Sequence, residues 1–186
     1  MAVHDINNLD WKDIKAGDIF MLDANVLHWL YSGYTFEPYI QNKSQQYSNF
    51  IGKLLSMNVK LGASAGNVQE ALHLIEKSEF ELYKKNNKHL PIGYNLKKFR
   101  NETAERKKVM QKTNAEYVGI SSVCEIYGLQ ITNKRLQSYI STMTSLQYDP
   151  IDYFVAENCC SCKRVNFITD DRDFRVDSRL EIYTLL

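Results

Sequence analysis

The stretch that decides the fold is DIFMLDANVLHWL, residues 18–30. Its first part is a continuous apolar run that ends at Asp23. A strand buried on both faces of a parallel sheet has this pattern, whereas a strand with one face in water alternates apolar and polar residues. The apolar residues after Asp23 recur at helical spacing, so the stretch predicts a buried strand followed directly by a helix.

Similar apolar runs occur three more times along the chain. VKLGAS (59–64) follows an amphipathic stretch, VNFIT (165–169) follows the helical pattern IDYFVAENC (151–159), and LEIYTLL (180–186) can add a further strand. This alternation predicts a three-layer α/β/α sandwich with a central, mainly parallel sheet and right-handed crossovers. The length of 186 residues fits one domain over residues 1–186.

Four acids lie where these predicted elements begin or end. Asp23 and Asp171 follow two predicted strands, and Glu70 and Asp152 lie near the starts of two predicted helices. Ligands of open parallel sheets bind outside the carboxyl ends of the strands, so we expect the four carboxylates to converge there. Two like charges about 4 Å apart repel by about 4 kcal/mol at an effective dielectric near 20. A cation must offset this repulsion, and Mg²⁺ or Mn²⁺ suits such an oxygen-rich site.

A divalent ion at this place activates a water molecule and stabilises charge on a phosphate, so the pattern predicts phosphodiester hydrolysis. Each acid also has a structural interpretation. Asp23 is a residue type that caps helices, and NVQE (67–70) has the spacing of a capping box. DPID (149–152) has the form of a cap, a proline at the first helical position and an acid in the first turn. TDDRD (169–173) is also typical of turns, so for each residue alone both interpretations stay open.

In this order, the acidic segments resemble those of the PIN-domain family of ribonucleases. MLDANVLHWL is similar to the family's opening strand and turn, with Asp23 followed two residues later by Asn25. ASAGNVQEALHL resembles the block that supplies Glu70, and DYFVAENC the block that Asp152 opens. FITDDRDF resembles the closing block, whose metal-associated acid is here Asp171.

The resemblance implies cleavage of RNA by a water that Mg²⁺ or Mn²⁺ activates, with Asp23, Glu70, Asp152 and Asp171 holding the metal. It implies Asp173 as an accessory or alternative ligand, and Asn25 or Thr169 as residues that orient a carboxylate or water. The family includes bacterial toxin nucleases and factors of RNA processing and decay. The partners that it implies are therefore an RNA substrate, an antitoxin or other protein regulator, and a second copy of the chain in a homodimer.

Residues 80–118 resemble nothing in short members of this family. Helical patterns over 66–87 and 96–117 lie on either side of LPIG (90–93), so this region is expected to form an inserted or elongated helical hairpin. Between residues 84 and 112 there are ten Lys or Arg and two acids. Lys and Arg neutralise nucleic-acid phosphates, which predicts a substrate-binding role. The residues expected in this role are Lys84, Lys85, Lys97, Lys98, Arg100, Arg106 and Lys107.

The aromatic residues of the same region, Tyr83, Tyr94 and Phe99, have two interpretations. They can stack on unpaired bases, or they can face the core of a solvated helical pair. Two other classes of function also compete with the nuclease. One is a catalytically inactive RNA- or protein-binding module on the same fold. The other is a haloacid-dehalogenase-like phosphatase, which needs a second aspartate where this chain has Asn25.

Composition excludes several broader classes. An apolar fraction of 44% and a charged fraction of 24% are ordinary for a folded domain. There is no targeting pattern and no apolar window near the roughly 18 residues of a membrane span, so we expect a cytoplasmic protein without membrane contact. Three of the four cysteines crowd into NCCSCK, which gives no disulfide framework. The CxxC of Cys159 and Cys162 lacks the second ligand pair of a structural zinc site.

Overall fold

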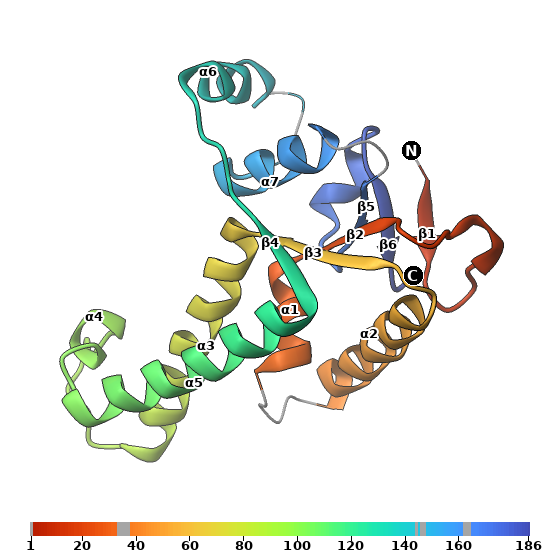
Figure 1. The fold of residues 1–186 in the computed structure, drawn as a ribbon. Helices are drawn as coiled ribbons and strands as arrows, with labels where there is room; N and C mark the ends of the chain where they lie inside the picture. The colour runs from red at the N-terminus through yellow and green to blue at the C-terminus, as the bar shows by residue number, and fades with distance from the viewer. Residues whose placement is uncertain (1, 33–37, 144, 146–147, 162–164) are drawn as a thin grey trace.

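The computed structural model describes residues 2–32, 38–143, 145, 148–161 and 165–186. Its centre is one six-stranded sheet in which every pairing is parallel, in the order β1-β6-β5-β2-β3-β4 (Figure 1). This confirms the predicted parallel sheet. The strands are β1 (Val3–Asp5), β2 (Ile19–Leu22), β3 (Lys60–Ser64), β4 (Cys124–Tyr127), β5 (Val165–Ile168) and β6 (Glu181–Thr184).

Seven α-helices and two short 3₁₀ helices connect the described strands. The α-helices are α1 (Ala24–Tyr31), α2 (Pro38–Ser56), α3 (Ala65–Asn86), α4 (Leu96–Phe99), α5 (Thr103–Val123), α6 (Asn133–Thr142) and α7 (Pro150–Ser161). The 3₁₀ helices are η1 (Trp11–Asp13) and η2 (Asp173–Val176). Within the described residues, no helix is both long enough and apolar enough to cross a membrane.

Alternating side chains of the central strands fill two separate cores. Phe20 and Leu22 of β2 point into a core that α1, α2 and α3 cover, whereas Met21 points into a core that α7 covers. Along β5, Phe167 and Ile168 divide in the same way. Because a strand places successive side chains on opposite faces, this division gives helix, sheet and helix layers. The predicted three-layer α/β/α sandwich is confirmed.

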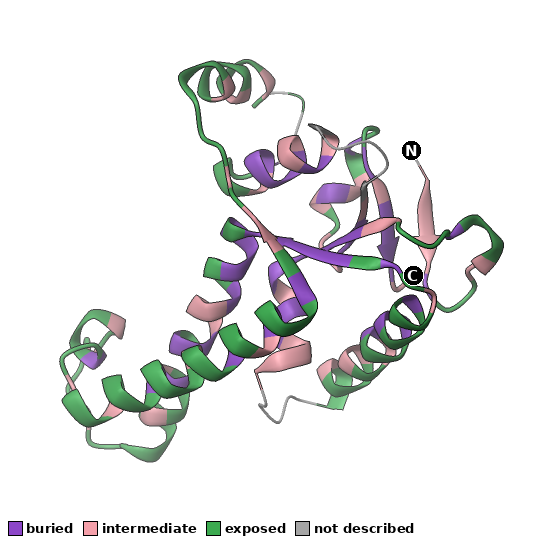
Figure 2. Cartoon of the chain, viewed as in Figure 1, coloured by how far each residue is buried: buried purple, intermediate pink, exposed green. Residues whose placement is uncertain are grey.

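The helices α3 and α5 run side by side away from the sheet, and α4 lies at their far end (Figure 1). We call these three helices and their connections the arm. Outside the contact between α3 and α5, most of the arm is exposed (Figure 2). The helical hairpin that the sequence predicts around residues 80–118 is therefore present. Its first helix begins earlier in the sequence than residue 80, because α3 starts at Ala65, beside the sheet.

One prediction for the arm was wrong. Residues 96–117 do not form one helix, because α4 ends at Phe99 and α5 begins at Thr103. The break lets Phe99, which is 1% exposed, pack against Phe80 and Tyr83 of α3. Phe99 is therefore a core residue and is not available to stack on a base. The burial of one aromatic ring, worth about 1.5–3 kcal/mol, outweighs the helix propensity of the residues at the break.

The sequence also left some elements unassigned. The edge strands β1 and β4 have three and four residues, and neither has a continuous apolar run. α6 was missed as well, and none of its residues is buried. The apolar side of α6 makes few core contacts. Among them, Tyr139 packs against Tyr153 and Phe154 of α7. Elements with so few core contacts leave a weak hydrophobic pattern in the sequence.

Candidate metal centre

The candidate site lies at the carboxyl ends of the central strands, where the direction of strand order reverses. β2 pairs with β3 on one side and with β5 on the other. In a doubly wound parallel sheet, such a switch point leaves a crevice between the loops that leave the two neighbouring strands. Asp23 follows β2 directly, and Thr169 to Asp171 follow β5. The chain therefore brings two of the predicted acids to the same place.

Hydrogen bonds hold both the side chain and the backbone of Asp23 in place. Its Oδ1 accepts from the Ala24 backbone N–H at 2.7 Å, which caps α1, and its Oδ2 accepts from the Thr169 hydroxyl at 2.8 Å. Its own backbone N–H donates to the Ile168 carbonyl at 3.0 Å. The capping interpretation of Asp23 is thus confirmed, but capping uses only one of the two carboxylate oxygens. The side chain is 6% exposed and its orientation is fixed.

Thr169 connects Asp23 to Asp171. Its hydroxyl oxygen, which donates to Asp23, also accepts from the Asp171 backbone N–H at 2.9 Å, and the residue is fully buried. Oδ1 of Asp171 accepts from the Asp173 backbone N–H at 2.9 Å, at the start of η2. The neighbouring Asp170 turns to α2 and pairs with Lys43 at 2.5 Å. Of the two adjacent aspartates, only Asp171 faces the other acids.

The capping box predicted for residues 67–70 is wrong. Ser64 is the N-cap of α3, and its hydroxyl accepts from the Asn67 backbone N–H at 3.0 Å. The Asn67 side chain instead donates to the Leu22 carbonyl at 2.9 Å, which ties the start of α3 to the end of β2. Glu70 lies beyond the first turn and does not cap the helix. Its place beside the sheet therefore has no capping explanation.

The capping interpretation of residues 149–152 is confirmed. Oδ1 of Asp149 accepts from the backbone N–H groups of Ile151 and Asp152 at 2.7 and 2.9 Å, and Pro150 is the first residue of α7. Asp149 therefore caps the helix. Asp152 occupies the first turn, and its carboxylate is not the cap.

The pKa values show that the acids share one electrostatic environment. The pKa of Asp23 is raised to about 7, mainly by burial and in smaller part by the charges of Glu70 and Asp171, while the hydrogen bonds from Thr169 and Ala24 oppose the shift. Burial raises the pKa of Asp152 to about 8, together with the charges of Asp149, Asp23, Asp171 and Glu70. The pKa of Glu70, which is largely exposed, is raised by partial desolvation and by the charges of Asp149 and Asp171. We call the group Asp23, Glu70, Asp152 and Asp171 the acidic edge.

The acidic edge suits a hydrated divalent cation. Its donors are carboxylate oxygens, the ligands that Mg²⁺ and Mn²⁺ prefer. In the part of the chain that the structure describes, no three His, Cys, Asp or Glu side chains meet closely enough to hold one ion together. Mg²⁺ usually keeps several waters and binds through one or two carboxylates. An ion at the acidic edge would therefore be bound directly by one or two of these carboxylates and would reach the others through water.

The fold has a counterpart among solved structures. A chain of the crystal structure of VapBC2 from Rickettsia felis, bound to a DNA fragment from their promoter, matches with a TM-score of 0.52 and 16% identity. The match covers 88% of this chain and 96% of that chain. No family profile and no curated protein sequence matches this chain. The similarity to VapBC2 establishes the fold.

The remaining predicted residues lie in three places. Asn25 is half-buried in the first turn of α1, next to Asp23, and Asp173 is half-buried at the start of η2. Cys159 is buried, and Cys162, the other half of the CxxC, lies outside the described residues. The predicted substrate-binding residues lie at the end of α3, in α4, in the connection after α4 and at the start of α5: Lys84, Lys85, Lys97, Lys98, Arg100, Arg106 and Lys107.

The sequence prediction missed the partner of two of these basic residues. Glu76 of α3 binds both Arg100 and Arg106, with N–O distances of 2.6 Å in each ion pair. Acids are rarely buried unless they are paired. Glu76 follows this rule, since it is only 7% exposed and has two cationic partners. The available signal was its place next to Ile75 on the apolar face of a helix. An acid at such a position predicts a cationic partner on a facing element.

Proposed function

We propose that this chain is a metal-dependent ribonuclease that hydrolyses RNA phosphodiester bonds at the acidic edge. One observation supports this most strongly. The pKa values of Asp23, Glu70 and Asp152 are raised, and charges of other acids of the acidic edge contribute to each shift. Such an arrangement destabilises the fold in the absence of a cation. Perturbed acids gathered at a ligand-binding edge are typical of functional sites.

Asp23 and Asp171 are the residues best placed to hold Mg²⁺ or Mn²⁺. They flank the same hydroxyl of Thr169, which fixes the orientation of the Asp23 carboxylate and of the Asp171 backbone. Glu70 and Asp152 would complete the site directly or through water, with Asp173 as a further oxygen donor and Asn25 orienting a carboxylate or water. A divalent ion supplies an activated water and stabilises charge on the phosphate.

Two further features support an RNA substrate and a protein partner. The motif order resembles that of PIN-domain ribonucleases, and the arm adds positive charge that would neutralise phosphates. One structural neighbour is VapBC2 bound to a DNA fragment from their promoter, which supports a protein regulator, such as an antitoxin, as a partner of this chain. A homodimer is part of the same proposal.

Cleavage of a labelled single-stranded RNA by the purified chain tests the proposal. We expect cleavage in Mn²⁺ or Mg²⁺ that stops on addition of EDTA and returns with excess metal, with 5′-phosphate and 3′-hydroxyl ends. A single-stranded DNA of the same sequence shows whether the 2′-hydroxyl matters. Binding without cleavage in any divalent metal would indicate the inactive module instead. Turnover of a small phosphomonoester would indicate the phosphatase.

A further inference from the structure

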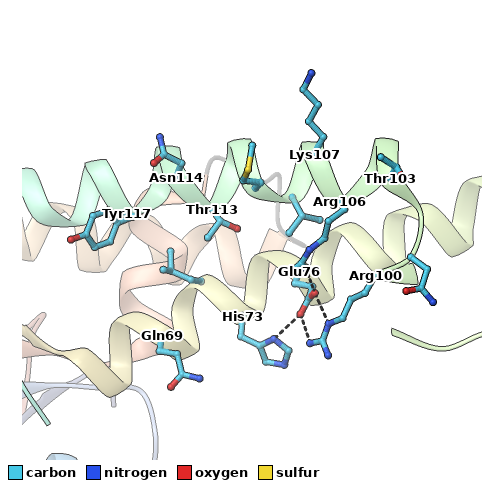
Figure 3. A pocket seen from close by; sticks show the side chains of 14 residues that line it. Gln69, His73, Glu76, Arg100, Thr103, Arg106, Lys107, Thr113, Asn114 and Tyr117 are labelled. Atoms are coloured by element: carbon cyan, nitrogen blue, oxygen red, sulfur yellow. Dashed lines mark hydrogen bonds and ion pairs between the residues drawn. The ribbon is translucent and has the colours of Figure 1, made fainter. Parts of the chain in front are cut away.

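A groove of about 950 Å³ runs between α3 and α5 on the arm (Figure 3). At one end it is lined by Gln69, the residue before Glu70 of the acidic edge, and by Tyr117 of α5. At the other end it is lined by Arg100 and Arg106. The groove therefore begins beside the acidic edge and leads toward the tip of the arm.

The two arginines at the far end are fixed by one carboxylate. Glu76 accepts from Nε and one terminal nitrogen of Arg100 at 2.7 and 2.6 Å, and from Arg106 at 2.6 Å (Figure 3). The side chains of Arg100 and Arg106 are still 45% and 55% exposed. A guanidinium has five N–H donors, so each keeps donors for a ligand. Two pre-oriented guanidinium groups are well suited to a phosphate.

The charges of the groove favour an anion. Lys107 also lines the groove, so three basic side chains line it against the single carboxylate of Glu76. The pairing with Glu76 has already restricted both arginine side chains, so less conformational entropy is lost when a phosphate binds.

Along α3 the groove also comes within one helical turn of Glu70 of the acidic edge. His73 lies one turn from Glu70, whose pKa it lowers, and its ring lies 3.2 Å from Glu76. Glu76 lies six positions after Glu70, which is about 9 Å along a helix. One extended ligand can therefore reach the acidic edge and the arginine pair together. Tyr117, 45% exposed at the near end, offers a ring on which a base can stack.

We propose that the groove between α3 and α5 binds a single-stranded nucleic acid, with a backbone phosphate against Arg100 and Arg106 and a base on Tyr117. The groove thereby feeds the strand to the acidic edge, and this last step rests on the proposed nuclease function. Binding itself needs no metal and no cleavage. Of the basic residues in the arm, those that line the groove contribute most, and Glu76 is a positioning residue.

Binding of a fluorescent oligouridylate, measured by anisotropy in EDTA over a series of NaCl concentrations, tests this proposal. The first variant is Glu76→Gln, Arg100→Gln and Arg106→Gln together, because removing the arginines alone would leave a buried carboxylate unpaired. We expect the Kd to rise at least tenfold. The slope of log Kd against log salt concentration should become shallower by about 0.7 for each lost phosphate contact. Tyr117→Ala, at an exposed position, should weaken binding about fivefold or more.

The matched control is Lys60→Gln, which changes the net charge by the same amount as the triple variant. Lys60 is exposed at the amino end of β3, whereas the acidic edge lies at the carboxyl ends of the strands. The Kd of the Lys60→Gln variant should stay within about twofold of that of wild type. Unchanged binding in the folded triple variant and in Tyr117→Ala, checked by circular dichroism, would overturn the proposal. A loss of binding in Lys60→Gln as large as that in the triple variant would also overturn it. A polyglutamate peptide that binds wild type but not the triple variant, while RNA binding is unchanged, would assign the groove to a protein partner.

The two proposals fail in different ways. If the groove variants lose binding but no metal supports cleavage, the groove stands and the nuclease function fails. If wild type cleaves RNA and the groove variants bind and cleave with unchanged KM, the nuclease function stands and the groove proposal fails.

Discussion

Asp23 at the acidic edge and Glu76 in the arm are buried to almost the same extent, 6% and 7% exposed, yet their pKa values move in opposite directions. Burial raises the pKa of Asp23 to about 7. Hydrogen bonds and charge from Arg100, followed by those from Arg106, lower the pKa of Glu76 to about 2 despite the burial. The neighbours, and not the depth of burial, decide which protonation state the fold favours.

This difference separates an acid that cationic side chains neutralise within the chain from one that they do not. Glu76 is neutralised within the chain, so it stabilises the arm without any ligand. The acidic edge gathers like charges, so its ionised form is unfavourable until a cation binds. A nucleic acid that occupies the groove would contact the arm through Arg100 and Arg106, and the acidic edge through a metal.

The largest expected effect concerns the acidic edge. Asp171→Asn should lower the rate of metal-dependent RNA cleavage by a factor on the order of 10³, because an ion that stabilises charge on the phosphate contributes several kcal/mol. Its control is the adjacent Asp170→Asn, whose side chain pairs with Lys43 and faces away. That variant should keep near-wild-type cleavage. Equal rates for the two variants would contradict the assignment.

The next effect concerns the arm. Glu76→Ala should lower the free energy of unfolding by about 2 kcal/mol, since charged hydrogen bonds are lost but the half-exposed arginines return to water. The folded pKa of Glu76 lies below its ordinary value of 4.5, so its stabilisation is present above about pH 4.5. It is lost as the pH falls toward 2. Urea unfolding at pH 7 and pH 3 measures this, and an equal deficit at both values would argue against the ion pair.

The smallest effect is a gain in stability. The folded pKa of Asp152 is about 8 against an ordinary value of 3.8, so the native state binds the extra proton between these values. Without metal, stability should therefore fall as the pH rises from about 4 to 8. Asp152→Asn should flatten this decline and add about 1 kcal/mol at pH 8 in EDTA. Thermal melts across this pH range test it, and a steeper decline in the variant would refute it.

The sequence predicted the parts of the fold that have many core contacts. The apolar run before Asp23 identified β2, and the runs at 59–64, 165–169 and 180–186 identified three more strands. Together they also placed two acids at the ends of neighbouring strands. The edge strands and α6 were missed because short or exposed elements leave no apolar run.

The misses at the site and in the arm have a different cause. Ser64 and Asn67 are both capping residue types, and only the observed start of α3 shows that Ser64 is the cap. The pairing of Glu76 with Arg100 and Arg106 depends on how α3 and α5 lie against each other. A run of basic residues in a sequence does not show which of them an internal acid already neutralises.

The central claim is that the acidic edge binds a divalent cation, and calorimetric titration with Mn²⁺ in two buffers of different ionisation enthalpy tests it most directly. The pKa of Asp23 is raised to about 7 and that of Asp152 to about 8, so at pH 6.5 we expect metal binding to release protons and to make the observed heat depend on the buffer. Asp170→Asn should behave like wild type, and Asp171→Asn should bind far more weakly. The claim would be contradicted if wild type did not bind Mn²⁺. It would also be contradicted if Asp170→Asn and Asp171→Asn bound Mn²⁺ equally well and neither released protons.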